Sequence, residues 1–175
     1  MFAVRTLCNN SNDAYARIYM YDEPSSDWVQ KGLDIQLTSC DGSVSLSESG
    51  NTIAIGEIGE IGQSGSSAND GKARIYRYED ITKDWVQLGS TIHGSNNGDY
   101  FAKKVGISAD GNIVGLARNG GDVLLFEYNE INDEWKSLWQ VNGVNSGRDV
   151  FGFSANGKSF VVMISPFEMQ VHQLQ

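Results

Sequence analysis

The stretch Ala16-Arg17-Ile18-Tyr19-Met20-Tyr21 returns in the same chain as Ala73-Arg74-Ile75-Tyr76-Arg77-Tyr78, displaced by 57 positions. The segment that follows the first copy, Asp27-Trp28-Val29-Gln30, returns with the same displacement as Asp84-Trp85-Val86-Gln87. A third copy, Val123-Leu124-Leu125-Phe126-Glu127-Tyr128, lies 50 positions after the second. Because the pattern persists while the connecting segments change length, the chain is built from repeats of one supersecondary unit.

Each repeat reads as four strands. In the second copy, short runs rich in β-branched and aromatic residues alternate with clusters of Gly, Asn, Asp and Ser, which is typical of strands joined by turns. The strands predicted there cover residues 72–78, 85–92, 101–108 and 112–117. Three copies carry a tight hairpin at the same phase, with Gly50, Gly111 and Gly157 where a positive φ is needed.

The repeated strand carries bulk on both of its faces. Side chains alternate along a strand, so Ile75 and Tyr76 point to opposite faces of the same sheet. Their counterparts in the other copies are also apolar or aromatic, which suits sheets stacked face to face. Four-stranded sheets stacked in this way are typical of propeller blades. The predicted fold is therefore all-β, a β-propeller of four-stranded antiparallel blades.

The chain begins and ends inside a repeat. Residues 2–5 stand where the last strand of a repeat is expected, and residues 169–174 reprise the repeated strand. This organisation predicts one β-propeller-like repeat domain over residues 1–175, an incomplete arc of two full blades flanked by partial ones. The alternative is a small ring closed by four blades, and the arc is favoured because no closing strand is visible. The repeats cover approximately residues 14–70, 71–120 and 121–166.

Two segments resemble a known repeat family. Residues 43–56 and 98–114 resemble the FG-GAP repeats of integrin α-subunit-like β-propellers, in degenerate copies. The resemblance implies a binding and adhesion module at the cell surface or outside the cell. The Phe-Gly pair of the family becomes Phe101-Ala102, and Gly56-Glu57-Ile58 replaces its Gly-Ala-Pro. The Asp-x-Asp-x-Asp-Gly loop that holds calcium in better-preserved members is missing, so we expect no metal and no cofactor.

Composition narrows the range of partners. The formal net charge is −9, which would repel a phosphate backbone or an anionic lipid surface. We therefore expect no nucleic-acid binding. No apolar run is long enough to span a membrane, and the first residues lack the pattern of a secretory signal. The chain as written would be cytoplasmic, whereas the family resemblance suggests an extracellular or cell-surface protein.

Motifs that suggest chemistry have structural explanations. The glycine-spaced segment 56–65 follows a strand but leads to no helix, so it is interpreted as a flexible connection rather than a phosphate-binding loop. Cys8 and Cys40 lack metal-type spacing and are expected to be ordinary thiols. The two histidines form no recognisable metal or triad pattern, and His172 stands at an aromatic position of the repeat.

Three residues are candidate ligand contacts. Trp139 has no counterpart in the other copies and could stack on a sugar, whereas the tryptophans that recur once per repeat are expected to pack between blades. His93 and Asp99 flank a turn rich in Gly, Ser and Asn and are the other two candidates, although structural or solvent-exposed roles are the main interpretation of both.

We predict a non-catalytic β-propeller module that binds a protein or carbohydrate ligand, with the remaining blades of a larger protein as a further partner. One alternative is a propeller hydrolase with its site in the central channel. The charged residues near the start of the innermost strands are Asp41, Lys103 and Asp149, and they do not repeat coherently. Another alternative is a truncated fragment without independent activity.

Overall fold

The computed structural model describes residues 2–5, 14–39, 42–58, 71–94, 100–118, 122–141, 151–165 and 168–173. Within these ranges the regular structure is entirely β, arranged in four antiparallel sheets. The first two sheets contain β1 (Phe2–Arg5), β2 (Ala14–Asp22), β3 (Asp27–Gln30) and β4 (Ile35–Leu37), and then β5 (Gly42–Leu46), β6 (Thr52–Glu57), β7 (Lys72–Glu79), β8 (Asp84–Gln87) and β9 (Ile92–His93). The last two contain β10 (Lys104–Ile107), β11 (Ile113–Ala117), β12 (Val123–Asn129) and β13 (Glu134–Val141), and then β14 (Phe151–Phe153), β15 (Ser159–Ser165) and β16 (Glu168–Gln173).

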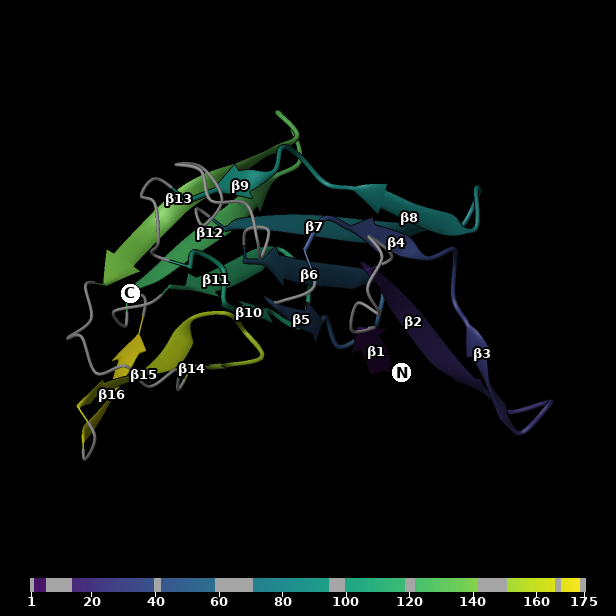
Figure 1. Cartoon of the computed structure of the whole chain (residues 1–175), viewed down its shortest axis with the longest axis horizontal. Helices are drawn as coiled ribbons and strands as arrows, with labels where there is room; N and C mark the ends of the chain where they lie inside the picture. Colours follow the sequence, from purple (N-terminus) through teal and green to yellow (C-terminus); the bar gives the residue numbers. More distant parts are fainter. Residues whose placement is uncertain are drawn as a thin grey trace.

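The four sheets stand side by side in an open arc (Figure 1). Strands β1, β5, β10 and β14 lie along the concave side, and β3, β8 and β13 lie along the convex side. The second and third sheets are complete four-stranded blades, and the short β9 is added to the second. The first sheet has three strands and the short β4, and the described residues of the last sheet form three strands. The prediction of an incomplete arc of four-stranded antiparallel blades is confirmed. The exact repeat boundaries stay a prediction.

Two of the predicted strands differ in detail. The strand predicted over residues 85–92 is divided into β8 and β9, both paired with β7, because Gly89 turns the chain with a φ of 60°. Phe101 precedes β10 in a turn where Tyr100 and Ala102 both have positive φ values, 49° and 58°. Left-handed backbone is uncommon for residues with a β-carbon, so alternation of residue types could not signal this turn.

Apolar side chains fill the spaces between successive sheets. Ile18 of the first sheet packs in one cluster with Ile53 and Tyr76 of the second. Ile75 of the second sheet packs in another cluster with Val114 of the third. Since each sheet is apolar on both faces, every internal sheet contributes to two cores, which is why the repeat can extend as an arc.

The recurring tryptophans join one blade to the next. The indole Nε1 of Trp85 donates a hydrogen bond of 2.8 Å to the carbonyl oxygen of Lys31, and Trp135 Nε1 donates one of 2.9 Å to Leu88. Gly32 leaves room for this contact, because a β-carbon there would lie 2.6 Å from the Trp85 ring. The recurring tryptophans of the second and third sheets therefore pack between blades, as the repeat phase predicts.

Backbone hydrogen bonds also link three hairpins of successive sheets. The amide of Glu48 donates to the carbonyl of Ala109 over 3.1 Å, and the amide of Ala109 donates to that of Ala155 over 2.6 Å. Each hairpin holds its glycine in the predicted left-handed conformation, with φ values of 63°, 79° and 69° at Gly50, Gly111 and Gly157. This chain of hydrogen bonds fixes the alignment of β5, β10 and β14, the inner strands that lead into the three hairpins.

Candidate functional site

The concave side of the arc is the surface on which the four sheets converge. Strand β10 contacts both β5 and β14. The hydroxyl of Ser43 accepts a hydrogen bond of 2.8 Å from the amide of Val105, and that of Ser45 accepts one of 3.3 Å from Ile107. Both pairs have the same sequence displacement, so β5 and β10 run parallel. The residues that begin these inner strands therefore lie at the same end of the concave side.

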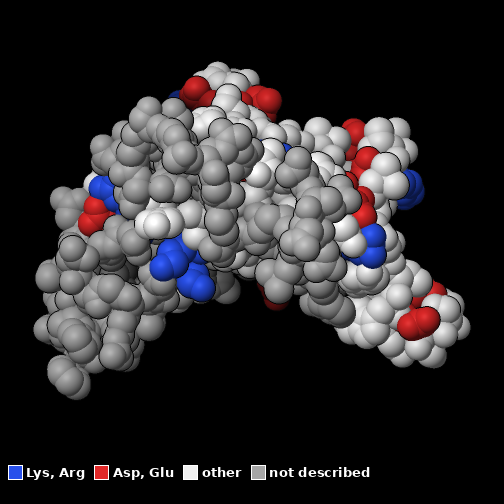
Figure 2. Space-filling view, in the orientation of Figure 1, with Lys and Arg blue, Asp and Glu red and all other residues white. Residues whose placement is uncertain are grey.

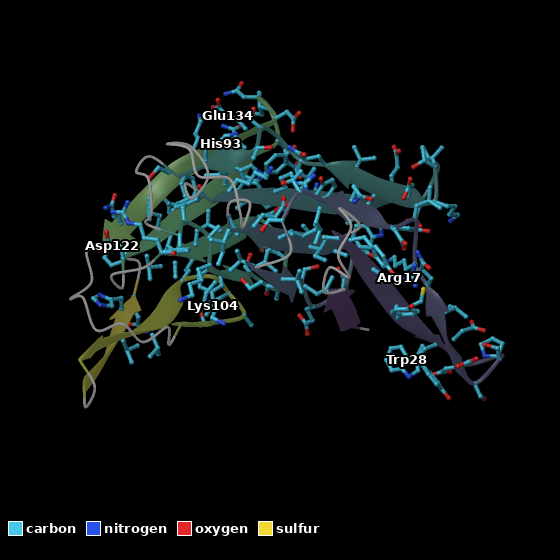
Figure 3. All side chains as sticks on the ribbon, in the orientation of Figure 1. Arg17, Trp28, His93, Lys104, Asp122 and Glu134 are labelled. Atoms are coloured by element: carbon cyan, nitrogen blue, oxygen red, sulfur yellow. The ribbon has the colours of Figure 1, made fainter. Side chains whose placement is uncertain are left out.

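Positive charge gathers at this end. Lys103 directly precedes β10, and Lys104 is its first residue and is exposed. Figure 2 shows a blue patch on the concave side, in the region where Figure 3 labels Lys104. Asp41 and Asp149, which precede β5 and β14 in the sequence, lie outside the described residues. Through these two lysines, the start of β10 on the concave side can attract an anion or polarise a carbonyl oxygen.

The described part of the inner strands supplies hydroxyls and an amine. Ser43 and Ser45 use their hydroxyl oxygens to satisfy backbone amides of the next sheet, a structural role for an otherwise exposed strand edge. Strands β5 and β10 contain no carboxylate and no imidazole that could act as a general base. Across the described ranges, no three His, Cys, Asp or Glu side chains are grouped to hold a metal ion.

The three candidate contact residues are not brought together. Trp139 lies in β13, with its ring centroid 5.5 Å from that of His172, and packs against Val123 and Leu125. His93 is exposed in β9, on another sheet (Figure 3). Asp99 lies outside the described residues. The surroundings of Trp139 are those of a packing residue between the third and fourth sheets, and ligand contact by these three residues stays a prediction.

A buried ionic network was missed by the sequence analysis. Glu57, assigned there to a flexible connection, is instead the last residue of β6 and only 1% exposed. One carboxylate oxygen lies 2.7 Å from Nη2 of Arg74, and the other accepts hydrogen bonds from the amide and hydroxyl of Thr38, which directly follows β4 of the first sheet. Arg74 also donates to the carbonyl of Gln36 and to the hydroxyl of Tyr76, over 2.8 and 2.7 Å. Each charged group of the network has partners within the protein, and the network joins two blades.

Among the described residues, Lys31 is the one lysine whose side chain is buried. It is 9% exposed, its Nζ lies 4.4 Å from the centre of the Tyr78 ring, and it donates to the side chain of Asn51 and, over 3.4 Å, to the carbonyl of Gly50. Burial lowers the pKa of this amine from its usual 10.5, because the charged form loses hydration. The corresponding position of the next sheet is Leu88, which packs on an apolar cluster. Lys31 therefore occupies a place that an apolar residue can fill.

Replacing Lys31 with Met is expected to raise the free energy of unfolding at neutral pH by about 1 kcal/mol, because a buried cation is exchanged for an apolar chain of similar length. The lowered pKa means that the folded state disfavours the charged amine. The destabilisation caused by the buried charge of Lys31 is fully present below the pKa of Lys31 in the folded state, and it fades as pH rises towards 10.5. Urea unfolding of both proteins from neutral pH to pH 10 should show the advantage of the variant shrinking. A destabilised variant at neutral pH would show that the contacts of the amine outweigh its desolvation.

Comparison with known proteins supports the architecture. No protein-family model matches the chain, and no curated protein shows significant sequence similarity to it. Among solved structures, KlAtg21 in its complex with the coiled coil of AgAtg16 superposes with a TM-score of 0.67 at 9% identity, over 99% of this chain and 49% of that one.

Two further similar structures carry the names of enzymes. A candidate 6-phosphogluconolactonase of Bacteroides uniformis superposes with a TM-score of 0.58 at 14% identity, over 98% of this chain and 50% of that one. The periplasmic gluconolactonase of Pseudomonas aeruginosa gives a TM-score of 0.55 at 14% identity, over 99% of this chain and 47% of that one. The chain thus spans about half the length of these structures.

These likenesses correct the prediction that the chain is not an enzyme. That prediction rested on the lack of a catalytic motif in the repeats, but solved structures of the same architecture are named as lactonases. A site assembled from single residues on several blades leaves no local motif, so a missing motif does not exclude catalysis.

The described residues contain no helix that is long and apolar enough to cross a membrane. The chain is an arc of β-propeller blades, in a fold whose solved examples bear the names of enzymes and of a protein in a coiled-coil complex.

Proposed function

We propose that the chain belongs to a β-propeller hydrolase that opens a sugar lactone, with the site at the end of the concave side where the inner strands begin. The observation that carries the proposal is the superposition of 98–99% of the chain on two structures named as lactonases. The parallel alignment of β5 and β10 supports it, because this alignment brings the first residues of neighbouring strands to a common end.

The chemistry requires a base and an electrophilic partner. Water attacks the lactone carbonyl while a carboxylate takes its proton, the ring carbon–oxygen bond breaks, and the ring oxygen is protonated to give the open hydroxy acid. Lys104 is exposed at this end and would stabilise the oxyanion that forms on the carbonyl oxygen. Asp41 and Asp149 are the carboxylates to test as the base, because Asp41 directly precedes β5 and Asp149 stands two residues before β14 in the sequence.

The test is acid release measured in a pH-stat with glucono-1,5-lactone and its 6-phosphate. We expect the complete chain to open at least one of them faster than buffer alone. Asp41→Asn or Asp149→Asn should lower the rate by about a hundredfold or more, whereas Lys158→Gln, at an exposed hairpin of the last sheet, should leave it unchanged. A folded chain that does not exceed the spontaneous rate with either lactone would refute the proposal.

A second candidate is the binding of a protein or carbohydrate ligand, favoured by the superposition on KlAtg21, which is named as part of a complex with a coiled coil. The FG-GAP resemblance belongs with this candidate. Binding of a helical coiled-coil peptide or an immobilised glycan, without lactone opening, would favour this candidate over the hydrolase.

A further inference from the structure

One hairpin turn occurs almost unchanged in the last two sheets. Ser154-Ala155-Asn156-Gly157 follows β14, and Ser108-Ala109-Asp110-Gly111 follows β10, so the two turns differ only at the third residue. In both turns, Oδ1 of this third residue accepts a hydrogen bond from the serine hydroxyl and another, of 3.0 Å, from the backbone amide two residues later. An aspartate and an asparagine therefore hold the same turn in the same way.

The turn of the last sheet uses only the oxygen of the Asn156 side chain. Oδ1 accepts both hydrogen bonds, and no hydrogen bond joins Nδ2 to another residue in the described part of the chain. In the third sheet, the second carboxylate oxygen of Asp110 accepts a hydrogen bond of 3.4 Å from the side chain of Asn112. Lys158 stands in place of Asn112 in the last sheet, so a cation follows Asn156 at that point. A carboxylate at position 156 would thus lose no hydrogen bond that the present side chain makes.

The turn also favours a carboxylate at its third position. The hydrogen bond from the Ser108 hydroxyl, together with that from the backbone amide of Asn112, lowers the pKa of Asp110. A lowered pKa means that the folded turn stabilises the ionised carboxylate relative to the unfolded chain. Ser154 and the amide of Lys158 present the same donors to residue 156, and a carboxylate accepts hydrogen bonds more strongly than an amide oxygen does.

The residue after Asn156 makes loss of its side-chain amide chemically accessible. Gly157 has no β-carbon, so its backbone nitrogen can approach Cγ of Asn156 without steric hindrance. When that nitrogen attacks Cγ, the new carbon–nitrogen bond closes a cyclic imide, the nitrogen loses its proton and Nδ2 leaves as ammonia. Water then opens the ring. Addition at Cγ breaks the new bond and gives aspartate, whereas addition at the backbone carbonyl carbon routes the chain through the side chain and gives isoaspartate.

We propose that Asn156 is a site of spontaneous deamidation, and that the last hairpin accepts the aspartate product with its turn intact. Asn156 is exposed, so water reaches it. The amide of Gly157 donates to the carbonyl of Ser154 over 2.9 Å, so the hairpin must open before the nitrogen can attack. Isoaspartate lengthens the backbone and cannot keep this turn, because a β-carbon at Gly157 would already lie 2.9 Å from Ile113 of the third sheet. The modification is independent of the proposed hydrolysis.

Peptide mapping by mass spectrometry, after incubation of the full chain at mildly alkaline pH, tests the site. We expect Asn156 to lose ammonia about tenfold faster than Asn112 or more, because Asn112 also lies at a hairpin but is followed by the β-branched Ile113. A sample unfolded in urea should react faster still at Asn156, since the amide of Gly157 is then released. Equal rates at the two asparagines in the folded protein, or reaction of Asn156 only in urea, would overturn the proposal.

Two reciprocal variants test whether the turn accepts the product. Asn156→Asp supplies the aspartate directly and should unfold at the same urea concentration as the unchanged protein at neutral pH, or at a higher one. Asp110→Asn makes the reverse change in the matched turn of the third sheet and should unfold at a lower concentration. Circular dichroism confirms that both variants are folded before the titration. A lower midpoint for Asn156→Asp would show that the hairpin does not accommodate the carboxylate, contrary to the proposal.

Discussion

Replacement of Glu57 with alanine is expected to lower the free energy of unfolding by about 3–5 kcal/mol, because it leaves a largely buried guanidinium without its carboxylate. Glu57 is 1% exposed and the Arg74 side chain 15%, so water cannot replace the lost ion pair without opening the space between two blades. The amide and hydroxyl of Thr38 would lose their acceptor as well. Urea unfolding followed by tryptophan fluorescence measures the change.

The repeat provides a matched control for this substitution. Arg17 is the counterpart of Arg74 and pairs with Asp34 over 2.7 Å, but both side chains are about one-third exposed. Asp34→Ala should therefore cause a much smaller loss than Glu57→Ala. Hydrogen bonding from Arg17 lowers the pKa of Asp34, so its small contribution is present above the ordinary carboxyl pKa and is lost as pH falls through the lowered one. Equal losses at the two sites would mean that burial does not determine the strength of these pairs.

The fold could be predicted because its strongest determinants are local and repeated. Side-chain alternation around Ile75 and Tyr76 required a strand with two covered faces, and the glycine of each hairpin required a turn with positive φ. The structure shows both features at those residues. The phase of Trp85 also indicated its packing role, because a contact between identical units recurs at identical positions.

Long-range ionic pairing could not be predicted in the same way. Glu57 lies in a glycine-rich segment that resembles a loop, and its partner Arg74 and hydrogen-bond donor Thr38 come from β7 and the preceding blade. Nothing in the spacing of these residues signals a common site. The same difficulty applies to catalysis on a propeller, since residues from the starts of separate strands meet only when the blades are assembled.

Non-repeating details were also beyond the sequence pattern. Lys31 and Leu88 occupy equivalent positions, yet one is a buried amine over an aromatic ring and the other an apolar contact. The pattern marks the position as one between blades and leaves its chemistry open. Candidate contacts chosen for being unusual, such as Trp139, can likewise be packing residues at a less regular interface.

A close approach between the second and third sheets at Gly56 predicts a second large effect. In Gly56→Ala, the new β-carbon would lie 1.9 Å from the carbonyl oxygen of Ala102 and 2.8 Å from a methyl carbon of Val105. The first obstacle is backbone, which cannot rotate away as a side chain can. The third sheet must therefore shift, and we expect the free energy of unfolding to fall by about 3 kcal/mol or more.

Gly152→Ala is the matched control for that clash. It also adds one methyl group to a strand glycine, but its nearest neighbour, the Val161 side chain, would be 3.9 Å away, an ordinary contact. Its effect on stability should stay within about 0.5 kcal/mol. Both changes are measured by urea unfolding. If Gly56→Ala is tolerated as well as Gly152→Ala, the turn at Phe101-Ala102 does not hold the second and third sheets at their observed separation. A selective loss at Gly56 would instead show that the close contact of β6 with the turn at Phe101-Ala102 and with Val105 requires a glycine at this position.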